Sequence, residues 1–372
     1  MATMQRRETR GWVGVRAILG ALAAGCFAVA TVALAACGDG RDAGSDGSSP
    51  LPAQAGQAGG TRGPAEARAC GWIPPDAQEV TPVASLRADS AGDPLCYETA
   101  SVLDAPKAVA VSLEKELREA TKMSDEDERR IGARMEAALH RERTLAGKLD
   151  LPEDVQRFGG YLRDIVQNLA RHSTRPGIRY RIHLVRSPVF NAAAMPGGVL
   201  LVFTGTLQGR DAVRDEAELA GVLAHEITHV ERRHVVAAYQ FARAALGEDT
   251  DEAVLAMEIL TQPLSTEHEL EADERGMELA TLAGYDPQAV VNLWRRHARS
   301  EPRPRRGRAR GDVVGDVLSG VDALLRSHPP AAVRACHAMD KLRWAREHAP
   351  CDRLYDGRTN LRTHVAGPRR PY

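Results

Sequence analysis

Two histidines four residues apart, His225 and His229, are the residues of this chain whose spacing points most directly to chemistry. Four residues make just over one helical turn, so both imidazoles would lie on one face of a helix and could bind a single metal ion. Glu226 follows the first histidine, which places a carboxylate beside that ion without making it a ligand. Two ligands and a neighbouring general base are typical of a zinc-dependent hydrolase, so the motif predicts that class of enzyme.

The residues around the motif indicate a largely buried helix rather than a surface helix with two solvated histidines. Asp211 or Asp215 could cap the start of this helix, and acidic residues in its first turn suit the helix dipole. An unpartnered imidazole in a buried helix costs free energy, and a bound metal would remove that cost. Apolar residues recur at helical spacing through the segment: Leu219, Val222, Leu223, Ile227 and Val230.

A third ligand must come from outside the motif, and the next residues do not supply it. Metzincins use a further histidine six residues after the second motif histidine, with a glycine between them. Val235 and Arg232 occupy those positions, which disfavours that class. His234 is one residue short, and on a continuous helix it would point about 180° away from His225. We interpret it as a histidine that supports a ligand from behind or lies at the surface.

Two downstream carboxylates are better candidates. Glu269 and Asp273 are four residues apart and would share one face of a helix, whereas Glu271 would point elsewhere. One carboxylate could bind zinc, while the other accepts a hydrogen bond from a ligand histidine and fixes its tautomer. The alternative is a solvated acidic helix face, the usual meaning of a run of charges. The apolar stretch 279–283 follows at once and favours a helix packed against the core.

Four segments together resemble motifs of the M48 family of zinc metallopeptidases, which are gluzincins. The resemblance covers roughly residues 112–350 and implies a helix-dominated, α+β, zincin-like peptidase domain with a small sheet beside the motif helix. The family's order of motifs is kept, and the matching segments are 191–205, 218–234, 265–276 and 327–334.

Carried over by position, the resemblance implies one zinc ion per chain and a role for each site residue. The family's zinc ligands fall on His225, His229 and Glu269. Its general base falls on Glu226, and Asp273 takes the place of the carboxylate that supports a ligand histidine. Two imidazoles and a carboxylate suit zinc, although they do not by themselves exclude another divalent ion.

The C-terminal motif places His328 and Arg334 near the open side of the zinc ion. The resemblance implies that they contact substrate or the developing oxyanion, or that the histidine blocks the metal in a latent form. Two positions depart from the family pattern, because Thr266 replaces an arginine and Ala193 replaces a phenylalanine. Neither is a metal ligand, so the departures concern packing and substrate preference.

The Pro-Gly-Gly segment before residue 199 predicts a turn between strands. Val199–Thr204 and Tyr180–Val185 read as strands because they are apolar and rich in β-branched residues. In the M48 family the strand beside the site pairs with an extended substrate through main-chain hydrogen bonds. An ordinary core strand is the alternative, and both can hold. The residues that match this substrate-binding segment are Asn191, Ala193, Pro196, Gly197 and Gly198.

The N-terminus has the pattern of a targeting segment. Arginines precede an uncharged, alanine-rich run that ends in Leu-Ala-Ala-Cys37, a match to the bacterial lipobox. Residues 1–36 are therefore expected to be a lipoprotein signal peptide, cleaved before a lipidated Cys37. An uncleaved anchor is the alternative, since about 20 apolar residues could span a bilayer. Residues 37–68, rich in Gly, Ala and Ser, are expected to be a flexible tether.

The remaining cysteines favour disulfides in an exported chain. Four cysteines allow three pairings, and we favour Cys70–Cys96 and Cys336–Cys351 because each pair is close in sequence. Residues 69–111 would then be a disulfide-stapled extension, 112–350 the peptidase domain and 351–372 a tail. Helices are expected over 113–145, 153–171, 215–246, 252–283 with breaks, and 287–299.

Together these features predict a zinc metalloendopeptidase, anchored by lipid in the bacterial cell envelope and facing the periplasm from the outer membrane in a Gram-negative cell. Its substrates would be extended or misfolded polypeptides, in a role that the resemblance implies is quality control. An envelope chaperone or assembly scaffold with little proteolysis is the alternative, as is a latent protease. The net charge of −1 and the basic loop 301–310 give no strong reason to expect nucleic-acid binding.

Overall fold

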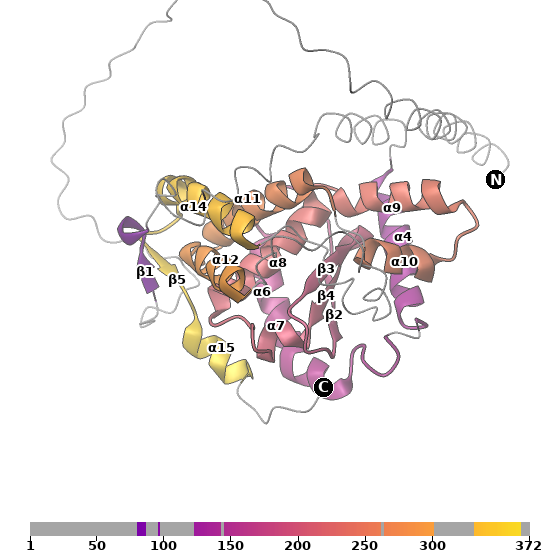
Figure 1. Cartoon of the computed structure of the whole chain (residues 1–372), viewed down its shortest axis with the longest axis horizontal. Coiled ribbons are helices and arrows are strands. Elements are labelled where there is room, and N and C mark those ends of the chain that lie inside the picture. Colours follow the sequence, from indigo (N-terminus) through magenta and orange to yellow (C-terminus); the bar gives the residue numbers. More distant parts are fainter. Residues whose placement is uncertain are drawn as a thin grey trace, which may run out of the picture. The chain divides into compact units, whose positions relative to one another are not determined.

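The computed structural model describes residues 80–86, 96, 123–142, 145–261, 264–300 and 331–365 of the chain. Helices surround a three-stranded sheet (Figure 1). The predicted α+β, helix-dominated fold is therefore confirmed. The short helices outside the main layers are η1 (Val83–Ser85), α5 (Pro152–Asp154), the π-helix η2 (Val155–Gly159), α7 (Thr204–Gln208) and α15 (Arg358–Val365).

The sheet has the order β2-β4-β3. β2 (Arg181–Val185) runs parallel to the central strand β4 (Val199–Phe203), and β3 (Ala192–Met195) runs antiparallel to it. Every residue of β4 is buried, which explains its continuous apolar run, because helices cover both faces of the sheet. Both predicted strands are present.

The turn between β3 and β4, η3 (Pro196–Gly198), requires its glycines. Gly197 has φ 75° and Gly198 has φ 84°, in the left-handed region that side chains other than glycine rarely adopt. A Cβ on Gly198 would also lie 2.7 Å from Cγ2 of Ile178. The predicted Pro-Gly-Gly turn is thus confirmed, and its backbone geometry explains why glycine stands there.

Two hydrophobic cores lie on opposite faces of the sheet. Leu200 and Val202 of β4 contribute to one core, and Leu201 and Phe203 contribute to the other. Helices packed in the first core are α6 (Gly160–Ala170), α8 (Glu216–Glu231), α11 (Thr266–Leu282), α12 (Gln288–Ser300) and α14 (Ala331–His348). Those in the second core are α4 (Asp125–Leu139), α9 (His234–Leu246) and α10 (Glu252–Thr261).

The motif helix is shorter than predicted. Asp215 caps α8, since its carboxylate accepts a hydrogen bond of 2.8 Å from the backbone N–H of Glu218. The expected helix over 215–246 is instead two helices, because Arg233 adopts a left-handed conformation with φ 62° between α8 and α9. This break redirects the chain immediately before His234.

The C-terminal segment is not a simple tail. β5 (Arg353–Tyr355) pairs antiparallel with β1 (Val80–Pro82), and α15 follows it. Leu354 and Leu361 are fully buried, so the segment packs on the domain. Three-residue strands have too little alternation to be recognised in the sequence, which explains why neither was predicted.

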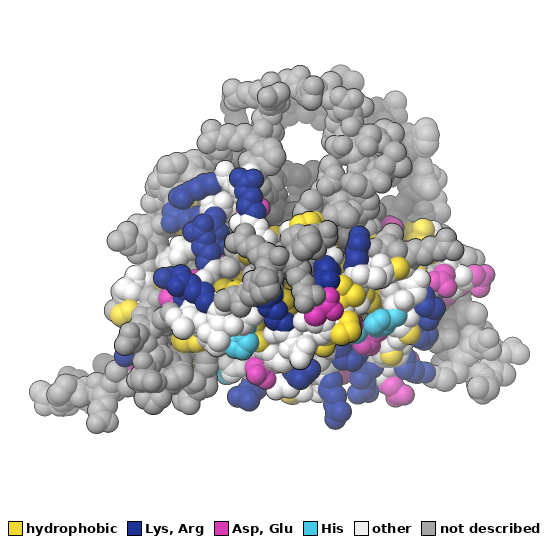
Figure 2. Space-filling view, turned by 90° about the horizontal axis from the view of Figure 1, so that it is seen from below, with side chains coloured by type: hydrophobic (Ala, Val, Ile, Leu, Met, Phe, Trp, Pro, Cys, Tyr) yellow, Lys and Arg dark blue, Asp and Glu magenta, His cyan; other side chains and the backbone are white. Residues whose placement is uncertain are grey.

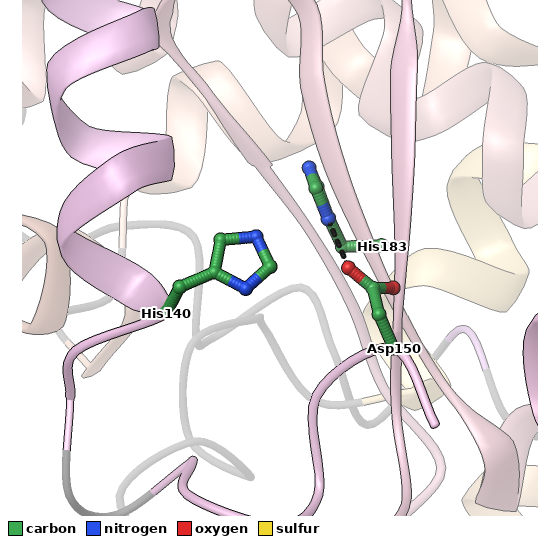
Figure 3. A group of neighbouring side chains, drawn as sticks. All are labelled: His140, Asp150 and His183. Carbon is green, nitrogen blue, oxygen red and sulfur yellow. Dashed lines mark hydrogen bonds and ion pairs between the residues drawn. The ribbon is translucent and has the colours of Figure 1, made fainter. Parts of the chain in front are cut away.

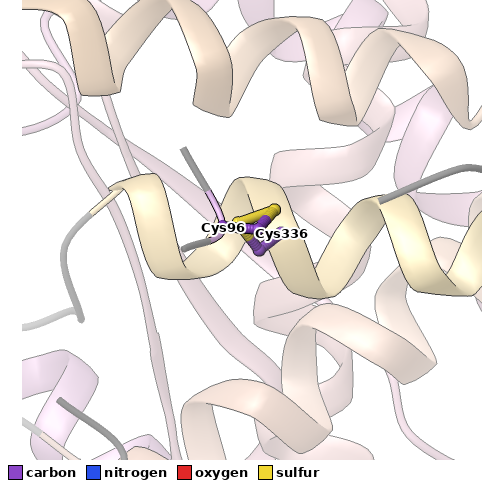
Figure 4. The surroundings of a disulfide bond; sticks show 2 residues. All are labelled: Cys96 and Cys336. Atoms are coloured by element: carbon purple, nitrogen blue, oxygen red, sulfur yellow. A yellow bond between two sulfur atoms is a disulfide. The ribbon is translucent and has the colours of Figure 1, made fainter. Parts of the chain in front are cut away.

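The predicted disulfide pairing is wrong. Cys96 bonds Cys336 on α14, over a sequence separation of 240 residues (Figure 4). Cys336 could not pair with Cys351 because α14 continues for 12 more residues, about 18 Å of helix, before it ends at His348. Cys351 is also disulfide-bonded. Cys70, the fourth of these cysteines, lies outside the described residues, as do Cys37, the proposed tether and the basic loop 301–310.

None of the helices in the described ranges is both long and apolar enough to cross a membrane. On the face drawn in Figure 2, basic side chains are spread among neutral ones and hydrophobic side chains form only small separate areas.

Candidate active site

His225, His229 and Glu269 come together in the core, and we call them the inner triad. The two histidines lie one turn apart on α8, and their Nε2 atoms are 3.0 Å from each other. Glu269 reaches them from α11, with carboxylate oxygens 3.4 Å from Nε2 of His225 and 3.5 Å from Nε2 of His229. All three side chains are buried. The residues predicted to share an ion thus lie within reach of one.

The spacing of these atoms fits a zinc ion. Zinc bonds of about 2.0–2.1 Å at tetrahedral angles place two ligand atoms about 3.3 Å apart. The inner triad has separations of 3.0, 3.4 and 3.5 Å, and its two imidazoles and one carboxylate are donors that zinc accepts. The site can therefore hold such an ion without rearrangement of the helices.

Close packing of α11 on α8 brings Glu269 to the histidines. Gly276 permits this approach, because a Cβ there would lie 2.9 Å from the backbone nitrogen of His225. Ser265 caps α11 by accepting a hydrogen bond of 3.2 Å from the N–H of His268. Glu269 and Asp273 are both buried one turn apart, so the alternative of a solvated acidic face is wrong for these two residues.

Asp273 holds His225 from behind. Its Oδ1 lies 2.8 Å from Nδ1 of His225, which leaves Nε2 turned toward the other members of the inner triad. Arg334 of α14 binds the same carboxylate, with Nε 2.9 Å from Oδ2 and a terminal nitrogen 2.5 Å from Oδ1. The guanidinium also lies over the ring of Trp294, 3.7 Å from its centroid. Arg334, expected near the open side of the ion, is thus engaged with Asp273.

The charges of this cluster compensate one another. Burial raises the pKa of Asp273, but Arg334 and His225 outweigh it and hold that pKa well below its usual range. Burial and the Arg334 charge lower the pKa of His225, whereas the carboxylates of Asp273 and Glu269 raise it, with a net result of about 9. Asp273 therefore stays ionised, as an acceptor for a ligand histidine must.

His234 holds the second histidine of the inner triad. Its Nδ1 lies 3.0 Å from Nδ1 of His229, and its Nε2 lies 3.1 Å from a carboxylate oxygen of Glu271. One tautomer satisfies both contacts: His229 donates from Nδ1, and His234 accepts there and donates to Glu271. The hydrogen bond from His234 keeps the pKa of Glu271 below its usual range. His234 is buried, so the surface interpretation is wrong, and its contact with His229 is the one that the supporting interpretation requires.

Trp294 and Glu271 are contributors that sequence reasoning missed. Trp294 stacks on Arg334 from α12, and nothing in the sequence links residues 294 and 334. Glu271 was expected to point away from the site, which is correct for the inner triad but overlooks its bond to His234. Only knowledge of the break before α9 would have revealed that contact.

Glu226 lies on α8 directly after the first histidine and is 3% exposed. Burial lowers the pKa of Arg334, but the charges of Asp273, Glu269 and Glu226 outweigh it and raise that pKa. Glu226 therefore lies within electrostatic range of the cluster behind His225. His328, the other residue expected near the ion, lies outside the described residues.

The proposed substrate-binding segment lies beside the motif helix. Asn191 is buried immediately before β3, and its backbone exchanges hydrogen bonds of 2.9 and 2.8 Å with the Thr206 hydroxyl. β3 packs against α8, pairs with β4 along one edge, and has no strand partner along the other among the described residues. Ala193 lies half-buried in β3, and Thr266 is exposed in the first turn of α11.

Comparison with known families agrees with this geometry. A model of the family Peptidase_M48 matches residues 157–341, a range that contains the inner triad, Asp273 and Arg334. Residues 157–341 therefore belong to peptidase family M48. The M48 domain includes β2, β3 and β4 and most of the helices packed around them.

Several proteins are similar to this chain across the M48 domain. The mitochondrial metalloendopeptidase OMA1 of Arabidopsis thaliana is 31% identical over 157 residues, which cover 38% of this chain and 29% of the relative. The β-barrel assembly-enhancing protease of Escherichia coli K12 is 26% identical over 181 residues, or 43% of this chain and 36% of the relative. The metalloprotease YcaL of the same organism is 24% identical over 208 residues, or 50% of this chain and 70% of the relative. The chain thus spans less than half the length of the first two.

Proposed function

We propose that this chain is a zinc-dependent endopeptidase whose ion is held by His225, His229 and Glu269. The observation that carries the proposal is the spacing of the inner triad, with its three buried donors between 3.0 and 3.5 Å apart. The outer nitrogens of both histidines are already bonded, to Asp273 and His234, so their Nε2 atoms are directed at one point, where a bound ion would replace the proton on His225. Membership of the M48 family supports the same assignment.

Glu226 is proposed as the general base and acid. A zinc ion in the inner triad would act as a Lewis acid that lowers the pKa of water and polarises a peptide carbonyl. Glu226 accepts the proton of the attacking water and delivers it to the leaving amine. Its burial on α8 limits competition from bulk solvent for that proton.

Asp273 and Arg334 are proposed to position His225 rather than to touch substrate. Asp273 fixes the tautomer of His225, and Arg334 keeps the aspartate ionised and in place. Because Trp294 covers the guanidinium, this support is a rigid unit of α8, α11, α12 and α14. A rigid support keeps the ligand geometry constant through turnover.

The substrate is proposed to bind as an extended strand along the open edge of β3. Main-chain hydrogen bonds to that edge would hold a peptide with little dependence on its sequence. The edge belongs to a strand that packs on α8, the helix that carries Glu226, so a bound peptide bond could reach the general base. Extended or misfolded polypeptides are the substrates that such a mode suits.

The test of the peptidase proposal is Glu226→Gln. We expect cleavage of a casein-like substrate to fall by about 10²–10⁴-fold, the usual contribution of general acid–base catalysis, while zinc content stays unchanged. Glu347→Gln, at an exposed glutamate on α14, is the control and should retain full activity. Undiminished turnover by the Glu226 variant would remove the assignment.

A lipid-anchored location in the bacterial envelope is proposed from the lipobox at Cys37. The names of the relatives point in two directions, since one is mitochondrial and another enhances β-barrel assembly. Cys37→Ser should release the protein from membranes and change its mature size, and unchanged fractionation would contradict the anchor.

Proteins captured in cells by the Glu226→Gln variant but not by the wild type would identify substrates. Equal capture by both would instead favour the scaffold alternative.

A further inference from the structure

A second group of potential metal-binding residues lies at the other edge of the sheet. His140 follows the last residue of α4, Asp150 lies in the segment before α5, and His183 is in the middle of β2 (Figure 3). One ligand atom from each lies within 4.8 Å of the others, and we call these residues the edge triad. β4 separates β2 from β3, so this group is distinct from the inner triad beside α8.

Asp150 is held in place by its own backbone and by β2. Its N–H donates to the carbonyl of Leu184, and its Oδ1 accepts from the N–H of Leu184, both at 2.8 Å. The neighbouring residue Leu149 forms a bridge with Val185 in the same register. These contacts leave Oδ2 directed at His183, 2.5 Å from its Nδ1.

His183 has a carboxylate at each ring nitrogen. Nδ1 faces Asp150, and Nε2 lies 2.8 Å from Oε1 of Glu136, whose other oxygen binds Nε of Arg181 at 2.7 Å. A neutral imidazole has only one N–H, so both carboxylates are satisfied either by a protonated ring, whose pKa is raised against the effect of burial by Asp150 and Glu136, or by a neutral ring with a cation on one side. When Nε2–H donates to Glu136, the Nδ1 lone pair is turned toward Asp150. A histidine that binds a metal usually donates one ring N–H to a carboxylate, and its other nitrogen faces the ion and the remaining ligands. Glu136 and Asp150 take these two positions around His183.

His140 completes the group from the solvent side. Its ring lies edge-on to that of His183, with centroids 5.5 Å apart and an angle of 76° between planes. Over the described residues its ring nitrogens make no hydrogen bond, so a lone pair is available. Because His140 is exposed, ions and water can reach the group without opening of the core.

We propose that His140, Asp150 and His183 form a second metal site, which takes a divalent transition-metal ion such as zinc. Two imidazoles and one carboxylate suit such an ion, and water would complete its coordination. Binding requires a small adjustment, because the 2.5 Å between Asp150 and His183 must widen to about 3.3 Å. A turn of the Asp150 carboxylate about its fixed Oδ1 supplies it. The ion would join the end of α4 to β2 and to the segment before α5.

Metal counting tests the proposal directly. Untagged protein is equilibrated with zinc chloride, freed of excess ion by gel filtration, and analysed by mass spectrometry for zinc per chain. We expect the wild type to hold one more ion than His140→Ala, whether or not the inner triad is filled. His348→Ala, at another exposed histidine at the end of a helix, should match the wild type. Equal zinc content in the wild type and His140→Ala would overturn the proposal.

A second measurement addresses the carboxylate behind His183. Glu136→Gln should weaken binding of the His140-dependent ion by about 10–100-fold, the usual cost of losing such a partner. Arg181→Ala breaks the ion pair with the same glutamate but keeps its bond to His183, and should stay close to the wild type. Unchanged affinity in Glu136→Gln would contradict the assigned geometry. His140 is exposed, so His140→Ala should keep the far-ultraviolet circular dichroism of the wild type.

Discussion

The inner and edge triads have the same donors, two imidazoles and one carboxylate, but the fold builds them differently. The inner triad has its donors already spaced for zinc, is fully buried, and is supported by Asp273, Arg334 and His234. In the edge triad only Glu136 supports a ligand from behind, through its contact with His183. The closest pair of donor atoms, on Asp150 and His183, lies only 2.5 Å apart. The same ligands can therefore give a preorganised catalytic centre or an adjustable site at the surface, depending on what lies behind them.

The largest expected effect is on peptidase activity, when one histidine is removed from each triad in turn. His229→Ala should lower peptidase activity about a thousandfold or more, because an ion worth several kcal/mol to the transition state is lost. His140→Ala should leave activity near that of the wild type. Cleavage of a casein-like substrate and zinc content are measured together. Comparable losses of activity in both variants would show that the triads do not work separately.

Graded chelation gives a control for this contrast. The edge ion should leave first and without loss of activity, because its site is exposed and must widen to bind. Activity should fall only with the second ion. Loss of activity with the first ion released would reverse the proposed ranking of the two sites.

The second effect concerns the support behind the inner triad. Asp273→Asn leaves the Arg334 charge buried without its partner, so we expect the free energy of unfolding to fall by about 3–5 kcal/mol. Zinc affinity should also fall by about 10–100-fold. Glu274→Gln, at the next residue, removes an exposed carboxylate that pairs with His337 and Lys341, and should change stability by about 1 kcal/mol or less. Denaturant unfolding and zinc titration provide both values, and equal effects at the two positions would contradict the role of Asp273.

The third effect tests the close approach of α11 to α8. Gly276→Ala should destabilise by about 1–3 kcal/mol, because its methyl group would meet the backbone of His225 at 2.9 Å. Separation of the helices would also move Glu269 and weaken zinc binding. Gly160→Ala is the matched control, since nothing lies within 4 Å of a Cβ at that helical position, and it should be neutral or stabilising. Unchanged zinc affinity in the Gly276 variant would show that the inner triad tolerates movement of α11.

The two triads also differ in how far the sequence could predict them. The inner triad rests on helical spacing, so His225 with His229 and Glu269 with Asp273 could be found as pairs. The edge triad joins residues 140, 150 and 183 through strand register and the end of a helix, and no local pattern marks that meeting. Tertiary contacts of this kind carry no periodic signal.

The fold shows the same limit. β2, β4 and the Pro-Gly-Gly turn follow from local composition and were predicted. The motif over 327–334 was recognised, but the helix α14 was not predicted, because half of its buried residues are alanine and Arg334 is buried among them. The direction of His234 depends on the left-handed conformation of Arg233. Glycine or asparagine would have indicated such a conformation in the sequence, but arginine does not. The Cys96–Cys336 bond likewise depends on which surfaces the folded chain brings together.

The last effect, on stability alone, separates pH dependence at the start of α8 from both triads. Burial and the neighbouring Glu218 charge raise the pKa of Asp215 to about 7, from an unfolded value of 3.8. Because the folded pKa is the higher one, its contribution to stability is present below pH 3.8 and is lost as pH rises through 7. Asp215→Asn keeps the cap acceptor but removes this titration. Between pH 4 and 7 the wild type should lose about 1.4 kcal/mol of unfolding free energy for each unit by which folding raises the pKa of Asp215. The Asp215→Asn variant should not show this loss.

The difference in pH dependence between the wild type and Asp215→Asn should be the same in zinc-loaded and chelated protein, because Asp215 lies about 15 Å along α8 from His225. Asp249→Asn, at an exposed aspartate, serves as the control and should leave the pH profile of the wild type unchanged. Parallel profiles for Asp215→Asn and the wild type would show that the cap does not titrate in this range. A flattening seen only after chelation would instead couple the start of α8 to the inner triad, and the helix could no longer be treated as a support that is rigid with or without its ion.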